Sequence, residues 1–165
     1  MEPPGPEPRA TLRKVASILR LDVLPAVCGR AEVFVATLSL LPLTVDEMGI
    51  SSWTAIGMVL KVTDGHDAHA RRHLGTALRL LAGTGRLSAE LEPLLRRRRL
   101  VRAALAARLR ACRDRPATMS RLSRADWEFS WAIYLRPMLA LELQLAKVLD
   151  GFVEVNSPEE GVRPV

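Results

Sequence analysis

The sequence has little of what secreted, membrane-spanning or disulfide-bonded proteins need. It contains only two cysteines, Cys28 and Cys112, too few and too far apart for a disulfide framework or a cysteine zinc site. Its most apolar segment, Ala31 to Leu41, is about half the ~20 residues that a membrane span requires, and Pro42 follows it. Residues 1–10 lack the apolar core of a signal peptide. We therefore expect a reduced, cytoplasmic protein with no membrane association.

Sequence motifs of catalysis are missing as well. The chain has no Ser/His/Asp order, no paired carboxylates at catalytic spacing and no glycine-rich phosphate loop. The segment Gly83-Thr84-Gly85 indicates a helix end, because no strand precedes it. The sequence therefore offers no recognisable catalytic motif, and we expect no cofactor.

Aromatic residues are few, and they are clustered. The chain has three Trp, one Tyr and three Phe, and four of these seven lie between Trp127 and Tyr134. Base stacking is one interpretation of such a cluster. Core packing is favoured, because the aromatic residues begin a longer apolar stripe at helical spacing that includes Trp127, Trp131, Tyr134, Met138, Leu141, Leu145, Leu149 and Phe152.

Helix-forming residues dominate the chain. Ala, Leu, Arg and Glu are abundant, while the alternation of Val, Ile and Thr that marks strands is nearly absent. We predict an all-α protein, a compact bundle of about six to seven helices. The expected organisation is a disordered leader at 1–10, a bundle at 11–155 and a flexible tail at 156–165. The bundle is one domain, or two small lobes at 11–86 and 87–155 that share a core.

Prolines and glycines set the expected helix boundaries. Breaks are predicted at Pro25 and Gly29, at Pro42, and at a Thr63-Asp64-Gly65 turn, whereas Pro137 is expected to kink its helix without dividing it. The predicted helices are 11–21, 30–41, 53–62, 66–81, 88–115 and 123–152.

One segment carries the positive charge of the chain. Between Arg86 and Arg124 there are 12 arginines and three acidic residues, a net charge of +9, while the rest of the chain has a net charge of −3. The helix predicted within this segment has an apolar face that includes Leu94, Val101, Leu105 and Cys112. Four arginines lie roughly opposite that face, namely Arg96, Arg99, Arg110 and Arg113.

This concentration of arginine favours a phosphate-contacting surface. An acidic protein partner and a plain solvated face are the alternatives, and the 21 arginines against three lysines also fit a codon bias. Codon bias alone should scatter arginine along the chain, and like charges at helical spacing destabilise a helix unless something compensates them. The predicted nucleic-acid contacts are Arg79, Arg86, Arg96, Arg97, Arg98, Arg99, Arg102, Arg110 and Arg113.

Three histidines lie close together on the predicted helix at 66–81. His66, His69 and His73 share one face, and zinc enzymes can use three histidines and a water. However, no carboxylate lies at the matching spacing, and all three come from one short segment. We expect a surface cluster without metal. A polar patch beside a phosphate and a small metal-dependent enzyme are the alternatives.

Several short motifs resemble the small subunit of type I-E Cascade, the CRISPR RNA-guided surveillance complex. The motifs are Leu74 to Leu81 followed by Gly85-Arg86-Leu87-Ser88, an arginine-bearing helix with Leu94, Leu95 and Arg97, Asp126-Trp127, and Leu149-Asp150-Gly151-Phe152. They cover about half of the chain. The region before Leu74 is short for that family, and the run from Arg96 to Arg99 is denser than its pattern.

The resemblance implies an all-α, non-catalytic subunit that holds nucleic-acid strands by their backbones and stabilises the R-loop. Its partners would be guide RNA, target DNA strands, other subunits of the complex and a second copy of itself. In such complexes the guide RNA reads sequence and the protein supplies shape and charge. The alternative is a helical protein-interaction module, with a Bcl-2-like groove or a basic face for an acidic partner.

Overall fold

The structure is a computed structural model, and it describes residues 9–47, 52–81, 85–113 and 131–157. The side chains at 37–47, 52–56, 112–113 and 131 lie outside this description. The helical elements in chain order are α1 (Arg9–Ile18), η1 (Leu19–Val23), α2 (Leu24–Glu47), α3 (Ser52–Leu80), α4 (Arg86–Arg113), η3 (Trp131–Leu135) and α6 (Arg136–Asn156). The predicted all-α class is confirmed for the described residues, which include no strand.

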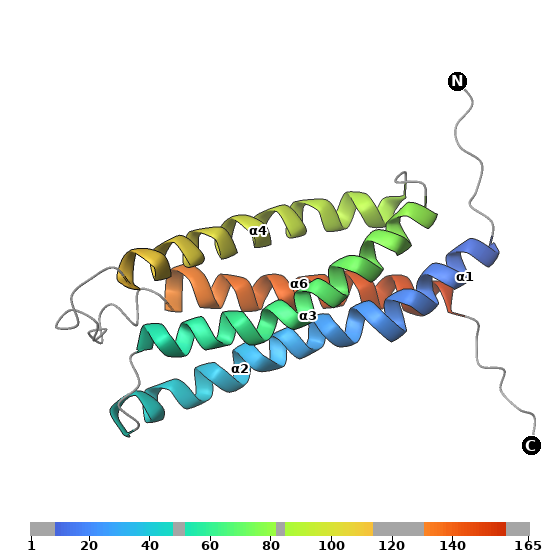
Figure 1. The fold of residues 1–165 in the computed structure, drawn as a ribbon. Helices are drawn as coiled ribbons and strands as arrows, with labels where there is room; N and C mark the ends of the chain where they lie inside the picture. Colours follow the sequence, from blue (N-terminus) through green and yellow to red (C-terminus); the bar gives the residue numbers. More distant parts are fainter. Residues whose placement is uncertain (1–8, 48–51, 82–84, 114–130, 158–165) are drawn as a thin grey trace, which may run out of the picture.

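The elements join into long helices that run roughly along a common direction (Figure 1). α6 packs against both α2 and α4, and α3 packs mainly on α2. None of the described helices combines the length and the hydropathy needed to cross a membrane.

The expected count of six to seven helices is not confirmed, because the described residues form four continuous helical segments. α2 runs through Gly29 and Pro42, and α3 runs through Gly65. Gly29 lies in α2 for a packing reason, since a Cβ at this position would lie 3.2 Å from Cε1 of His66 on α3. This glycine therefore permits close approach of the two helices, and tertiary packing overrides its weak helix propensity.

Two of the prolines follow wide helical turns. η1 is a π-helical turn, and its last hydrogen bond joins the Leu24 N–H to the Leu19 carbonyl. Pro25 comes next, and Pro137 in the same way follows the π-helical η3. A π-turn adds a residue and changes the carbonyl positions that a proline ring would otherwise meet. The chain consequently continues as a helix past both prolines. A break had been predicted at Pro25, and no break had been predicted at Pro137.

Two apolar clusters make up the core. The larger cluster contains buried residues from Val15 to Val153, including Leu91 of α4 and Leu149 of α6. Residues from both of the expected ranges, 11–86 and 87–155, thus contribute to one apolar cluster. The smaller cluster contains Phe34, Val59, Leu60, Leu105, Leu135 and Met138. The predicted apolar stripe of the last helix is buried at Met138, Leu141, Leu145 and Leu149, whereas Trp127 and the Trp131 side chain lie outside the described residues.

Between these clusters, four charged side chains meet, one from each long helix. We call them the buried ion network: Arg30, Asp67, Arg98 and Glu142. Glu142 is 0% exposed, Arg30 2% and Arg98 5%. Each network residue lies along its helix between residues of the larger cluster and residues of the smaller one.

Glu142 is the centre of the network. Arg30 donates to both of its oxygens, from Nε to Oε1 at 2.9 Å and from Nη2 to Oε2 at 2.7 Å. Arg98 donates from Nε to the same Oε1 at 2.5 Å, and from Nη1 to Oδ1 of Asp67 at 2.7 Å. The two guanidinium groups and the two carboxylates balance in charge. Such forked, charge-assisted hydrogen bonds are the geometry that makes a buried ion pair tolerable.

This balance predicts a large loss of stability when the central charge is removed. Glu142→Gln keeps the size of the side chain but leaves two buried guanidinium groups without their shared anion. We expect the free energy of unfolding to fall by roughly 3–5 kcal/mol, measured by urea denaturation. Glu154→Gln, an exposed position on the same helix, is the matched control and should leave the midpoint nearly unchanged. Equal midpoints for the two variants would refute a structural role for the network.

Candidate anion-binding groove

The nine arginines that were predicted to contact nucleic acid differ in their exposure to solvent. Six are exposed: Arg79, Arg86, Arg96, Arg97, Arg99 and Arg110. Arg102 is partly buried and is paired with Asp64 of α3. Arg98 is buried. The side chain of Arg113 lies outside the described residues.

Arg98 corrects the sequence prediction. It was expected on a solvent-facing surface, but it is 5% exposed and donates to Asp67 and Glu142. The reason is its register, because Arg98 lies seven residues after Leu91 and seven before Leu105, both of which are fully buried. Residues seven apart share a face of an α-helix. Arg98 therefore belongs to the apolar stripe of α4 and its charge is neutralised inside the protein.

The exposed arginines of α4 also point in different directions. Successive residues of an α-helix are about 100° apart, so Arg97 and Arg99 lie on opposite flanks of α4. Arg99 lines cavities together with residues of α3. Helical periodicity places Arg96 and Arg110 on the same flank as Arg99, and it places Arg86 on the flank of Arg97. Arg86 also pairs with Glu90 at 2.9 Å. The predicted single surface is thus two surfaces, one of which faces α3.

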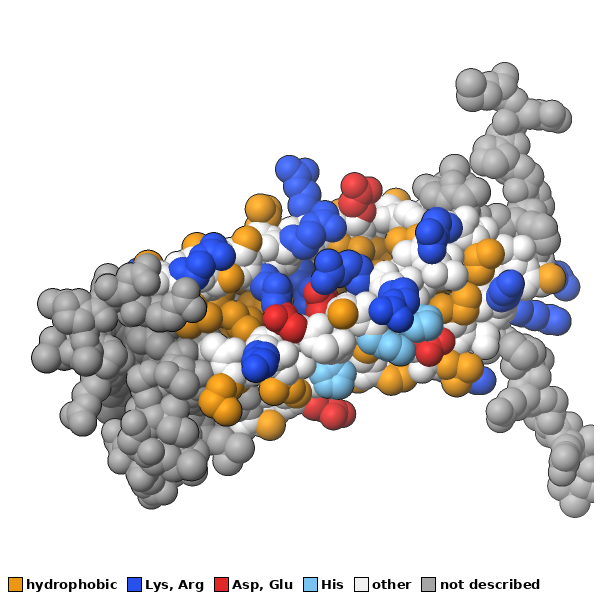
Figure 2. Space-filling model, in the orientation of Figure 1, with side chains coloured by type: hydrophobic (Ala, Val, Ile, Leu, Met, Phe, Trp, Pro, Cys, Tyr) orange, Lys and Arg blue, Asp and Glu red, His pale blue; other side chains and the backbone are white. Residues whose placement is uncertain are grey.

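Two adjoining cavities separate α3 from α4. The outer one, of about 610 Å³, is lined by Leu78, Arg79, Ser88, Leu91, Glu92, Leu95 and Arg99. The deeper one, of about 260 Å³, shares Leu95 and Arg99 with it. Together they form what we call the α3–α4 groove. Figure 2 shows this face with Lys and Arg side chains distributed over both helices around a partly apolar hollow.

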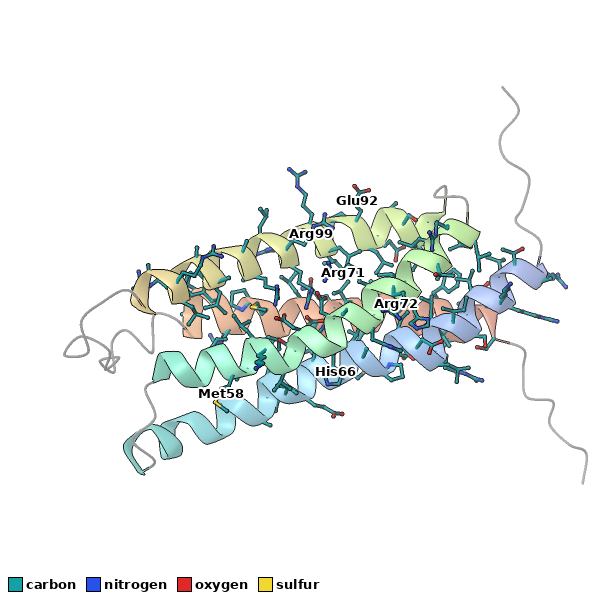
Figure 3. All side chains as sticks on the ribbon, in the orientation of Figure 1. Met58, His66, Arg71, Arg72, Glu92 and Arg99 are labelled. Atoms are coloured by element: carbon teal, nitrogen blue, oxygen red, sulfur yellow. The ribbon has the colours of Figure 1, made fainter. Side chains whose placement is uncertain are left out.

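The deeper part of the groove is cationic at its walls and apolar at its floor. Five guanidinium groups line it: Arg30, Arg71, Arg98, Arg99 and Arg102. Its floor includes Val23, Val27, Ala70, Leu74, Leu145 and Leu149. Asp67 is the one carboxylate among its lining residues, and no His, Cys or hydroxyl group is among them. Figure 3 shows Arg71 lying between α3 and α4.

The groove has more positive charge than its carboxylates neutralise. Asp67 accepts from Arg98 at 2.7 Å and from Arg71 at 2.9 Å, and Asp64 pairs with Arg102. Including Glu142, three carboxylates face the five guanidinium groups of the deeper cavity, and the outer cavity adds Arg79 and Glu92, so the groove keeps two positive charges in excess. Moreover, Nη1 of Arg30 is buried, has no hydrogen-bond acceptor and lies 3.8 Å from Asp67. A buried donor without an acceptor is costly, so the site favours an anion that supplies one.

Sequence reasoning missed Arg30, Asp67, Arg71 and Glu142 as parts of this site. The sequence does contain a signal for burial, because Arg30, Asp67 and Glu142 each interrupt an apolar stripe at helical spacing. Glu142 follows Met138 by four residues and precedes Leu145 by three. A charged residue at such a position is either misplaced in register or buried with a partner. The sequence does not reveal which partners meet, since Arg30 and Glu142 are 112 residues apart.

The three histidines do not form one cluster. His66 packs against Gly29 of α2. A Cβ added at Gly29 would lie 3.2 Å from Cε1 of His66. His69 and His73 lie together, with ring centroids 4.5 Å apart. Both face Asp22 of η1, at 3.7 Å from each ring nitrogen to a carboxylate oxygen.

No protein-family model matches the chain, and comparison with curated proteins and with solved structures finds no significant match. The function must therefore be argued from the groove itself.

We expect a small polyvalent anion to stabilise the protein by filling the groove. Pyrophosphate at ten times its Kd should add about 1.4 kcal/mol to the free energy of unfolding. This corresponds to a rise in Tm of roughly 3–6 °C for a chain of this size, measured by differential scanning calorimetry against KCl at equal ionic strength. The double variant Arg71→Gln/Arg99→Gln should lose at least half of this rise.

The matched control removes the same charge from the opposite flank of α4, as Arg86→Gln/Arg97→Gln. It should keep the full rise in Tm. If both double variants respond to pyrophosphate alike, the anion does not bind in the α3–α4 groove.

Proposed function

We propose that the protein is a non-catalytic binder of nucleic-acid backbone, and that the α3–α4 groove is its contact surface. The observation that carries this proposal is the row of cations along both walls of one groove. Separate cationic side chains on unrelated faces would not support it, because a strand contacts one continuous surface.

The length of the row favours a polymer over a single small anion. On α3, Arg71 and Arg79 are exposed and line the groove. Lys61 and Arg72 are exposed too, but they line neither cavity, and helical periodicity places them on the outer face of α3. Arg71 and Arg79 are about 12 Å apart along the helix at 1.5 Å per residue. On α4, Arg96, Arg99 and Arg110 are exposed and extend over about 21 Å on the same rule. Figure 3 labels Arg71 of α3 and Arg99 of α4 on the two sides of the groove. Charges spaced along such a distance suit the successive phosphates of a strand.

The groove supports contacts with phosphates better than contacts with bases. None of the residues that line its two cavities is aromatic, and stacking on aromatic rings is how proteins commonly hold unpaired bases. Arginine side chains instead offer charge and forked donors to phosphate oxygens. Binding should therefore be largely independent of sequence.

The resemblance to the small subunit of type I-E Cascade supplies a setting for this activity. In that setting the groove would hold target DNA strands or guide RNA during R-loop formation, beside other subunits and a second copy of this chain. A subunit of that kind needs charge and shape but no base recognition, because base pairing with the guide reads sequence. The groove offers positive charge but no aromatic side chains for holding bases, which agrees with such a role.

A second candidate is an acidic amphipathic helix as the partner. The apolar floor formed by Leu74, Leu145 and Leu149 favours it, since helix-in-groove recognition combines apolar anchors with complementary charge at the rim.

The test compares two quadruple variants that each remove four positive charges. The groove variant carries Gln at Arg71, Arg79, Arg96 and Arg99. The control variant carries Gln at Arg9, Arg13, Lys14 and Arg20, which are exposed on α1 and η1. Affinity for two single-stranded DNA oligonucleotides of unrelated sequence is measured by fluorescence anisotropy at several salt concentrations.

We expect the groove variant to bind both oligonucleotides more weakly and to similar degrees. Its plot of log affinity against log salt should be flatter by up to about 2.8, since each phosphate contact contributes about −0.7 for single strands. The control variant should keep most of the slope. Equal slopes for the two variants would contradict the proposal. If the groove variant instead loses an acidic amphipathic peptide while binding DNA as the parent does, the second candidate is favoured.

A further inference from the structure

Asp22, His69 and His73 come together at the surface from two different helices. His69 and His73 lie four residues apart on α3, and Asp22 lies in the π-turn η1. Nε2 of His69 is 3.7 Å from Oδ1 of Asp22, and Nδ1 of His73 is 3.7 Å from Oδ2. The potential ligand atoms of all three residues lie within 4.8 Å of one another. Figure 2 shows the imidazoles in two separate groups on this face.

We propose that Asp22, His69 and His73 bind a divalent transition-metal ion of the zinc class. Two imidazoles and one carboxylate are ligands that this class of ion takes, and two histidines at i and i+4 on a helix present their nitrogens to one ion. The site would have three protein ligands and an open position for water. It is independent of the groove and of the proposed function.

The observed distances are close to those that a bound ion requires. Zinc lies about 2.0–2.2 Å from imidazole nitrogens and carboxylate oxygens, so two ligand atoms at a tetrahedral angle are about 3.4 Å apart. The two distances of 3.7 Å exceed this by about 0.3 Å, each to a different carboxylate oxygen of Asp22, and all three ligand atoms lie within 4.8 Å of one another. Rotation of these exposed and half-buried side chains would have to close the remaining gap.

The open position follows from the exposure of the three side chains. The side chain of His69 is 52% exposed, that of Asp22 37% and that of His73 32%. The ligands are thus held on one side by their helices and open to water on the other. A structural zinc site would be closed by a fourth protein ligand, which the described residues do not provide.

The π-turn gives Asp22 its place in this site. π-turns inside α-helices are rare and often occur at functional sites. η1 follows α1 directly and brings the carboxylate against α3, although the two histidines follow Asp22 by 47 and 51 residues in sequence. The sequence argument against metal depended on the lack of a carboxylate and on ligands from a single segment. Asp22 removes both objections, so this proposal replaces the expectation that no metal binds at these histidines.

His66 is the matched control within the same helix. It was grouped with the other two histidines by spacing, but it packs against Gly29 and is not among the clustered ligands. Its replacement removes an imidazole from α3 without touching the site. A bound ion would join η1 to α3, so metal should also stabilise the folded chain.

The test measures Zn²⁺ binding to the full-length, untagged chain after treatment with EDTA, by isothermal titration calorimetry. We expect one ion per chain. His69→Ala, His73→Ala and Asp22→Asn should each weaken binding at least about tenfold, because they remove ligands directly and even supporting residues contribute 10–100-fold. His66→Ala should bind as the parent does. Circular dichroism confirms that the variants are folded.

A second readout is the Tm with and without Zn²⁺, which should rise for the parent and for His66→Ala but not for Asp22→Asn. Three results would overturn the proposal: no binding by the parent, an equal loss on replacing His66 and His69, or unchanged affinity in Asp22→Asn. The last of these would indicate surface histidines that bind zinc adventitiously.

Discussion

The carboxylate of Glu142 is the constraint on which the arrangement of the helices depends. It lies fully buried on α6 and accepts from Arg30 of α2 and Arg98 of α4, and Arg98 in turn reaches Asp67 of α3. An apolar side chain can slide by a turn along its neighbours at modest cost, but a forked hydrogen bond between charged groups has one geometry. Each of the four long helices contributes one residue, so their relative registers are fixed together. We infer that the network specifies the packing of the bundle, a role that buried polar groups have in some helical assemblies.

The network also explains why a groove opens between α3 and α4. The long side chains of Arg98 and Arg102 cross from α4 to Asp67 and Asp64 on α3, where an apolar interface would bring the helices into direct contact. The space around these side chains forms the deeper cavity of about 260 Å³. The same arginines that connect the two helices therefore line a site with more guanidinium groups than carboxylates. The arginines at the centre are neutralised and those at the rim are exposed, so the groove has excess positive charge without a fully buried, unpaired charge.

Local pattern in the sequence predicted much of this fold and only part of the site. The apolar stripes of α4 and α6 and the all-α class follow from helical periodicity, a short-range property. The break predicted at Gly29 was wrong because packing of α2 on α3 outweighs the propensity of a single glycine, and α3 also continues through Gly65, where no neighbour approaches the position of a Cβ. Arg98 was assigned to the surface because its charge was weighed above its register. The partners of Asp22 and Glu142 lie far away in the sequence, and a single sequence carries no direct signal for such pairings, even though the register of Glu142 indicates that it is buried.

Exchange of the arginine side-chain Nε–H protons with water, measured by NMR, tests the central claim most directly. In the free protein, the signals of Arg30 and Arg98 should exchange slowly, as buried donors to Glu142, while those of Arg97 and Arg99 should exchange rapidly. Adding a single-stranded oligonucleotide should slow exchange at Arg99 and leave Arg97 unchanged, because only Arg99 lines the groove. Rapid exchange at Arg98 in the free protein, or equal protection of Arg97 and Arg99 by the oligonucleotide, would contradict the account.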